Sequence, residues 1–254
     1  METTSRAYGV AAGLRKTFGL AYAQTLIGLR NLYPLISVGL IPGALYLMFF
    51  LVGGQELSQH VLYGALIAQA LGAGLVSMPQ FIVIHRDRRL LDMYIASPMG
   101  PLSYMFGFAG GRLIYMLPGM VILFSILLGF GFMQLHNLPA TLLIVLVTFA
   151  LGSMIGFTIA TYTKSLFVTG AVSNILNSLF MMLPPVMYPL AIIPDRYQWL
   201  AFLAPTTAVA ELIRWVNNLA ELTSGRLTLC ILLLAAWLLA CLAMVLFKSR
   251  WREV

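Results

Sequence analysis

Residues 139–162 read PATLLIVLVTFALGSMIGFTIATY, and this run contains no Asp, Glu, Lys, Arg or His. An apolar run of ~20 residues is long enough to cross a hydrocarbon layer of ~30 Å as an α-helix. A membrane β-strand is only ~10 residues long and alternates apolar with polar side chains, so a continuous apolar run favours a helix. This stretch therefore predicts an all-α integral membrane protein.

Five further apolar stretches surround this run, and only one of the six contains a charged residue. Of the 254 residues, 61% are hydrophobic and 9% are charged, whereas ~25% of the residues in an ordinary soluble domain are charged. The sequence predicts a single transmembrane domain over residues 1–254, with helix kinks at Pro34, Pro42 and Pro118. The six predicted transmembrane helices are 32–52, 61–84, 104–132, 139–162, 166–189 and 227–247.

The N-terminal segment, residues 1–31, predicts an amphipathic helix over residues 8–30 that lies on the membrane. Val10, Leu14 and Phe18 recur at helical spacing on one apolar face. Basic residues in the same segment favour the membrane surface that carries anionic lipid; they are Arg15, Lys16 and Arg30. The alternative is a seventh, weakly hydrophobic span. No cleavable signal peptide is expected, because the basic pair interrupts the apolar stretch.

The distribution of Lys and Arg predicts the orientation of the helices. Cytoplasmic loops are enriched in these residues, and eleven of them fall on the side of the N-terminus against three on the other side. The eleven are Arg6, Arg15, Lys16, Arg30, Arg86, Arg88, Arg89, Lys164, Lys248, Arg250 and Arg252. The three are Arg196, Arg214 and Arg226. Both termini are therefore expected in the cytoplasm, and the net charge of +7 reflects membrane topology rather than a nucleic-acid partner.

Arg112 is the only Asp, Glu, Lys or Arg within the six predicted transmembrane helices. A charge in hydrocarbon costs ~2.5–3.5 kcal/mol or more, and ion-driven carriers keep such residues as relays. Their near absence favours a transport protein that obtains its energy from a partner. Arg112 has two interpretations: an interfacial anchor that reaches the headgroups, or a contact with the partner or the substrate path.

The predicted cytoplasmic loop 85–104 reads HRDRRLLDMYIASPMGPLSY and carries a dense cluster of charges. An apolar set follows the cluster, and Pro98 ends the pattern, which predicts a short amphipathic helix. The alternative is that the charges only anchor the preceding span.

The fifth predicted helix is interrupted in its outer half by Pro184, Pro185 and Pro189. Flexible and polarizable side chains beside these prolines would suit varied amphipathic substrates, and an ordinary kinked helix is the alternative. With Arg112, the predicted substrate-path residues are Met181, Met182, Met187 and Tyr188.

Two pairs of glycines, Gly107–Gly111 and Gly152–Gly156, have the spacing that permits close helix contact. Polar residues within the spans are expected to hydrogen-bond between helices; they are Ser153, Thr158, Ser173, Asn174 and Asn177.

Two segments resemble the ABC-2 type transporter permeases, and the entry to the first span, 29–54, resembles their drug- and lipid-export branch. The first is 88–112, RRLLDMYIASPMGPLSYMFGFAGGR, in which Ser97-Pro98 and Gly111-Arg112 match the family motif. The second is 184–214, PPVMYPLAIIPDRYQWLAFLAPTTAVAELIR. Its matching residues are Pro194, Trp199, Pro205, Glu211 and Arg214.

The outer segment within 190–226 is more apolar than a solvated loop, which predicts short re-entrant helices there. The resemblance itself implies six helices per subunit and an N-terminal interfacial helix. It also implies a dimer with the substrate path between subunits, and a separate ABC ATPase that binds ATP and Mg, so that this chain binds no cofactor. The short helix after the second span would couple the permease to the ATPase. The implied coupling residues are Arg86, Asp87, Arg88, Arg89, Leu91 and Asp92.

Two other function classes compete with an ATP-driven exporter. A self-contained secondary transporter or channel would work with this chain alone. An intramembrane enzyme would need a polar cluster, but His60, His85 and His136 fall on different sides of the membrane without metal-ligand spacing. Cys230 and Cys241 are too far apart along one helix to form a disulfide. A drug-like, natural-product or lipid-like substrate is expected, and both a homodimer and a heterodimer stay open.

Overall fold

The computed structural model describes residues 19–22, 44, 47–48, 50–51, 58–88 and 101–249. The predicted interfacial helix 8–30 and first transmembrane helix 32–52 lie almost entirely outside these residues. Throughout the described part of the chain, all regular secondary structure is helical.

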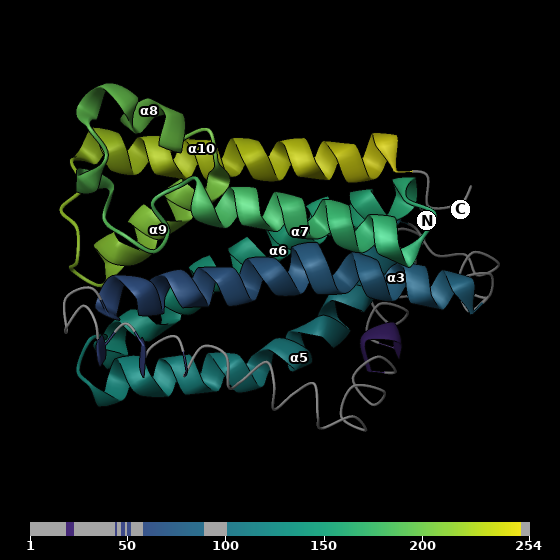
Figure 1. The fold of residues 1–254 in the computed structure, drawn as a ribbon, viewed down its shortest axis with the longest axis horizontal. Helices are drawn as coiled ribbons and strands as arrows, with labels where there is room; N and C mark the ends of the chain where they lie inside the picture. The colour runs from purple at the N-terminus through teal and green to yellow at the C-terminus, as the bar shows by residue number, and fades with distance from the viewer. Residues whose placement is uncertain are drawn as a thin grey trace, which may run out of the picture.

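The second and third predicted spans are long helices. A continuous helical segment, here called the Ser58–Asp87 helix, contains the π-helix η1 (Ala73–Ser77) and ends with α3 (Met78–Asp87). Helix α5 (Pro101–Gly129) follows, and Pro118 lies within it. Figure 1 shows that α5 changes direction along its length, as expected of a proline that removes one helical hydrogen bond.

The remaining helices complete the bundle. The one-turn η2 (Leu135–Asn137) leads into α6 (Leu138–Tyr162), and α7 (Leu166–Met182) comes next. Short helices form the connection to the last span: η3 (Leu190–Ile192), η4 (Asp195–Tyr197), α8 (Gln198–Ala201) and α9 (Pro205–Val216). Helix α10 (Ser224–Ala243) continues into the π-helical η5 (Met244–Lys248).

Four of these helical segments are long and apolar enough to cross a membrane: Ser58–Asp87, Leu102–Gly129, Leu135–Tyr162 and Ser224–Lys248. They correspond to the second, third, fourth and sixth predicted spans. The outer surface of the bundle is apolar: Phe167 and Met182 of the shorter α7 are 86% and 80% exposed, and Phe247 at the end of the last span is 82% exposed. Such side chains suit contact with lipid, because a soluble protein rarely exposes large apolar patches.

The fifth predicted span differs from the structure at its outer end. It was expected over 166–189, but α7 ends at Met182 and the chain bends over the next residues. Pro184 and Pro185 explain this end, because proline cannot continue a helix and also restricts the residue before it. The 17 residues of α7 span only about 26 Å at ~1.5 Å per residue.

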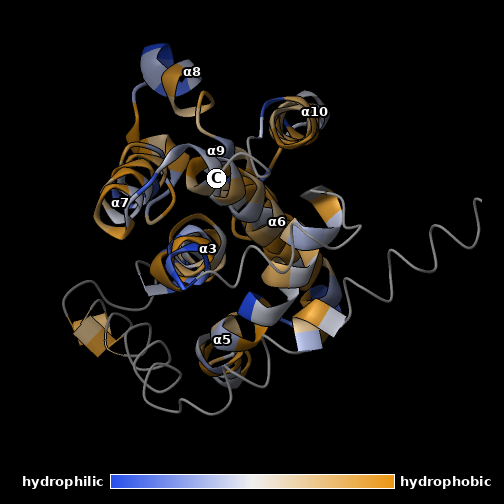
Figure 2. Ribbon diagram, turned by 90° about the vertical axis from the view of Figure 1, so that its right-hand side faces the viewer, coloured by the Kyte–Doolittle hydropathy of each residue, from blue (hydrophilic) through white to orange (hydrophobic). Residues whose placement is uncertain are grey.

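Helix α6 lies at the centre of the bundle. Figure 2, which views several helices nearly end-on, shows α3, α5, α7 and α10 arranged around the inclined α6. Glycines allow η1 to contact α6 backbone to backbone. A Cβ placed on Gly74 would lie 2.5 Å from the Ser153 nitrogen and 2.7 Å from the Gly152 carbonyl carbon, and a Cβ on Gly156 would overlap the Gly74 carbonyl oxygen. The predicted close contact at Gly152–Gly156 is therefore confirmed.

The π-helix η1 contacts helix α6 on one side and lines a cavity on another. Gly74 and Leu75 are buried, and Gly74 faces α6, whereas Ala73, Val76 and Ser77 line a cavity on another side. A π-turn inserts one residue into an α-helix and is frequent at functional sites. It therefore combines a tight helix contact on one side with a cavity-lining side on another.

Candidate functional site

The structure describes three of the six predicted coupling residues. Arg86 is half-buried, and its Nη1 donates a 3.5 Å hydrogen bond to the carbonyl oxygen of Ala160 in α6. Asp87 and Arg88 are exposed at the end of α3. Arg89, Leu91 and Asp92 lie outside the described residues. Arg86 thus contacts the bundle, as the anchoring interpretation expects, while the next two charges point away from it.

The four predicted path residues near the prolines do not share one environment. Met182 is exposed on the end of α7, whereas Met181 packs against the hydrophobic core. Met187 lies beside Gly64, where an added Cβ would be 2.5 Å from the methionine sulfur. The carbonyl oxygen of Tyr188 accepts a hydrogen bond from Arg214. None of the four is among the described residues that line the cavity around Arg112.

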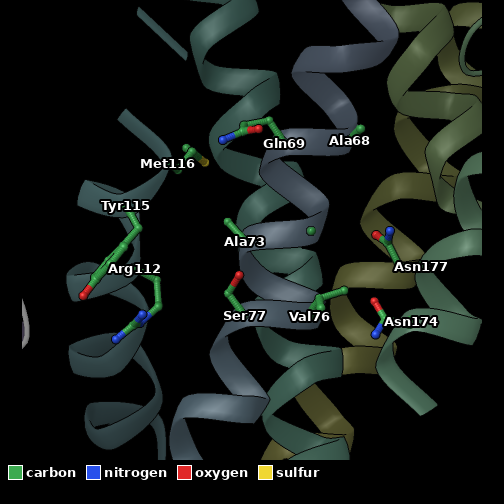
Figure 3. A pocket seen from close by; sticks show the side chains of 11 residues that line it. Ala68, Gln69, Ala73, Val76, Ser77, Arg112, Tyr115, Met116, Asn174 and Asn177 are labelled. Carbon is green, nitrogen blue, oxygen red and sulfur yellow. The ribbon is translucent and has the colours of Figure 1, made fainter. Parts of the chain in front are cut away.

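This cavity has a volume of about 290 Å³ and lies between the Ser58–Asp87 helix, α5 and α7 (Figure 3). Its polar lining residues come from all three helices. Figure 3 places Gln69 and Met116 towards one end and Arg112, Ser77 and Asn174 towards the other. The described lining residues are Ala68, Gln69, Gly72, Ala73, Val76, Ser77, Arg112, Tyr115, Met116, Asn174 and Asn177.

Arg112 is buried inside the bundle, with 1% of its surface exposed. The guanidinium carbon lies 3.3 Å from the centre of the Phe81 ring and 4.4 Å from that of Tyr115. Its three guanidinium nitrogens have no hydrogen-bond partner within the described structure. The side chain therefore packs between helices rather than reaching outward as an anchor, and two aromatic rings are its observed neighbours.

The described lining of the cavity carries no negative charge to match this guanidinium. Among the lining residues that the structure describes there is no Asp or Glu. Asn174, Asn177, Gln69 and Ser77 add neutral polar groups, and the Asn177 side-chain oxygen has no hydrogen-bond partner among described residues. The cavity therefore carries one positive charge and several groups able to form hydrogen bonds.

The predicted interhelical hydrogen bonds are largely not formed. Thr158 donates to the carbonyl oxygen of Met154 within its own helix, at 2.9 Å. The hydroxyls of Ser153 and Ser173 are buried without a partner in the described part of the chain. For Thr158 the prediction was wrong, because a threonine hydroxyl can satisfy itself on the preceding helical turn.

A second polar cluster, which sequence reasoning missed, lies around Arg214 in α9. Its Nη1 contacts Glu211 Oε1 at 3.0 Å, and its Nη2 donates to three carbonyl oxygens at 2.8–2.9 Å. The acceptors are those of Pro185, Val186 and Tyr188. Burial lowers the pKa of Arg214 and Glu211 raises it, but an arginine guanidinium keeps its charge in proteins.

Arg214 therefore connects the segment after α7, residues 185–188, to α9 through hydrogen bonds. The spacing of Glu211 and Arg214, three residues apart within an apolar helix, was the available signal. The positive-inside count treated Arg214 only as a charge in an outer loop.

Two further cavities border α7. One, of about 460 Å³, is lined by Asn174, Ile175, Ser178, Leu179, Met182 and Leu183. The other, of about 530 Å³, lies between the end of α7, the α8 region and Trp237 of α10, and its lining is mainly apolar. The first shares Asn174 with the Arg112 cavity.

The fold and these cavities define a multi-pass helical membrane protein with a charged site between its helices. The sequence model described as ABC-2 family transporter protein matches residues 53–247. The chain therefore belongs to the ABC-2 transporter family, and it is a membrane permease domain whose ATPase is a separate protein. A comparison with curated proteins finds no match.

Proposed function

We propose that this chain is the transmembrane subunit of an ATP-binding-cassette exporter. It moves a drug-like, natural-product or lipid-like molecule out across the cytoplasmic membrane, using ATP and Mg²⁺ bound by the partner ATPase. Membership of the ABC-2 family carries the proposal. The charge content agrees with it, because Asp87, at the end of α3, is the one carboxylate in the four described membrane-length helices. Ion-coupled carriers generally need such groups as relays.

The proposal includes a fuller topology than the described residues cover. The subunit has six transmembrane helices, an N-terminal interfacial helix and both termini in the cytoplasm. It pairs with a second permease subunit, identical or related, within the lipid bilayer. Residues 190–226 form re-entrant outer helices, which is supported by exposed apolar side chains there: Trp199, Leu200 and Leu203.

Coupling to the ATPase is assigned to the end of α3 and the loop that follows it. Asp87 and Arg88 are exposed and available to a partner. Arg86 is hydrogen-bonded to α6, so a movement of this loop would be transmitted to the bundle through Arg86. Arg89, Leu91 and Asp92 complete the proposed docking surface.

Charge reversal at this surface tests the coupling assignment. The variant Arg88→Glu is expected to insert normally but to lose most ATP-driven transport, because a like charge would face the ATPase groups that match Arg88. Transport and ATPase co-purification are both measured, with Arg196→Glu on the exposed outer helix η4 as the matched control. Undiminished transport by Arg88→Glu with normal ATPase binding would contradict the assignment.

The function itself is tested by purification and reconstitution. The tagged full chain is extracted from its native membrane, and the co-purifying proteins are assayed for ATP hydrolysis. We expect no hydrolysis by the permease alone, and substrate movement in vesicles only when the ATPase and ATP are both present. Uphill transport by this chain alone on a proton or sodium gradient would overturn the proposal.

A further inference from the structure

We infer that the Arg112 cavity binds the anionic head of an amphipathic molecule, while the apolar tail lies in the adjoining groove on α7. The inference rests on the proposed transport function and names the class of molecule recognised: an alkyl or polycyclic carboxylate, phosphate or sulfate. It is argued from the charge, the geometry and the shape of the cavity.

The first step is the unmatched charge. Transferring an ion out of water costs several kcal/mol even after the protein has relaxed, unless an opposite charge or hydrogen bonds compensate it. Arg112 is 1% exposed and makes no hydrogen bond within the described structure. A cation–π contact to a desolvated guanidinium contributes ~2 kcal/mol or more. The rings of Phe81 and Tyr115 therefore offset part of the cost, but neither ring supplies an opposite charge or an oxygen acceptor for the N–H groups, which a bound anion would.

The second step is the geometry of the guanidinium. The Phe81 ring centre lies 3.3 Å from its central carbon, so the ring occupies one face of the planar group. The N–H groups of a guanidinium point outward in its plane, in a fork that matches a carboxylate or phosphate. In Arg112 none of the three nitrogens has a hydrogen-bond partner among the described residues. The aromatic contact leaves these donors unused, and because each nitrogen is covered, the side chain has to turn towards the cavity for its N–H groups to meet an anion.

The third step is the size of the cavity. Its volume of about 290 Å³ equals that of about ten water molecules at ~30 Å³ each. This space is at the lower end of the ~300–1,000 Å³ range for ligand pockets and suits a hydrated anionic head. Gln69, Ser77 and Asn177 line the same space and can hydrogen-bond to the remaining oxygens of the head.

The fourth step is the place for a tail. Asn174 is exposed on α7 and lines both this cavity and the 460 Å³ groove. From Asn174 the groove continues along apolar side chains, and Ile175 and Met182 are 60% and 80% exposed. A molecule with its head at Arg112 can pass Asn174 and lay its tail along α7. Met182, a predicted path residue, would then contact the tail.

The test measures binding of two probes with identical tails to the purified full-length chain in dodecyl maltoside. Dodecyl phosphate is anionic and dodecylphosphocholine is zwitterionic, and binding is followed by the ligand-dependent rise in melting temperature. The wild-type protein should bind dodecyl phosphate about tenfold or more tightly, because a charge-assisted bidentate pair forms only with the anion. Equal affinity for the two probes would overturn the inference.

Variants identify the residue responsible. Arg112→Gln should remove the preference for dodecyl phosphate, and Arg112→Lys should retain part of it, since lysine keeps the charge without the planar fork. Arg196→Gln, on the exposed η4, is the matched control and should behave as wild type. If Arg112→Gln does not fold, Ala73→Phe, which fills the cavity from η1, should abolish the preference with Arg112 intact. Preserved selectivity in either folded variant would overturn the inference.

A final arm separates a membrane lipid from an exported solute as the source of the anion. Binding is repeated in nanodiscs of phosphatidylcholine alone and with phosphatidylglycerol added. Competition by phosphatidylglycerol supports the site with a lipid headgroup as occupant, and undiminished binding supports it with a solute as occupant. Neither ATP nor ATPase enters these assays, so absent ATP-driven transport with intact anion selectivity would count against the proposed function and not against this site.

Discussion

Replacing Arg214 by glutamine is expected to destabilise the protein severely. The side chain is 1% exposed, and it forms an ion pair with Glu211 and hydrogen bonds to three backbone carbonyl oxygens. Removing one partner of a buried ion pair costs ~3–5 kcal/mol, because the other charge stays buried without compensation. The variant should show a large fall in melting temperature in detergent, with loss of folded protein during extraction.

Two companion variants make this result specific to the Arg214 cluster. Arg214→Lys should fall between wild type and Arg214→Gln, because an ammonium keeps the charge but cannot reach all four acceptors in one plane. Arg196→Gln, in the exposed η4, should have little effect, since exposed charges contribute little to stability. A melting temperature for Arg214→Gln equal to that of Arg196→Gln would show that the cluster does not stabilise the fold.

The second large effect is expected from Gly156→Leu. A side chain at Gly156 would collide with the Gly74 carbonyl oxygen, and backbone atoms of a packed helix cannot rotate away as a side chain can. Overpacking a core already costs ~1–3 kcal/mol where side chains can adjust, so a backbone collision should separate η1 from α6. The measurement is the yield of monodisperse protein after extraction and gel filtration.

The control is Gly225→Leu, because a Cβ added to Gly225 at the start of α10 meets nothing within 4 Å. It should extract like the wild type. Gly156→Ala should lie between the two, since even one methyl group meets the Gly74 backbone. Normal yield and melting temperature for Gly156→Leu would show that the helices do not meet as closely as the structure places them.

The sequence predicts the long helices well, because length and apolar composition determine whether a segment can cross a membrane. Four of the six predicted spans appear as membrane-length helices, and the fourth prediction, 139–162, differs from α6 by one residue. The fifth ended early because Pro184 and Pro185 stop the helix outright. Hydrophobicity extended the predicted span past the prolines, although they were expected to interrupt its outer half.

The site was harder to predict, because it depends on which helix faces meet. From sequence, Arg112 could have been an anchor at the headgroups or a contact in the path, and only packing places its guanidinium 3.3 Å from the Phe81 ring centre. Asn174 and Asn177 were expected to join helices, whereas they line a cavity. No periodicity signals η1, whose extra residue sets which side chains of the Ser58–Asp87 helix face that cavity.

That extra residue also affects how this protein should be compared with its relatives. Each residue turns an α-helix by about 100°, so in a homologue without the insertion the positions after Ser77, including that of Phe81, would face another direction. Pairing such sequences correctly requires a one-residue gap inside a membrane span, where alignments seldom open one. An ungapped alignment would match Met78 onward with neighbours that point in another direction, and would pair the wrong residue with Phe81, whose ring contacts Arg112.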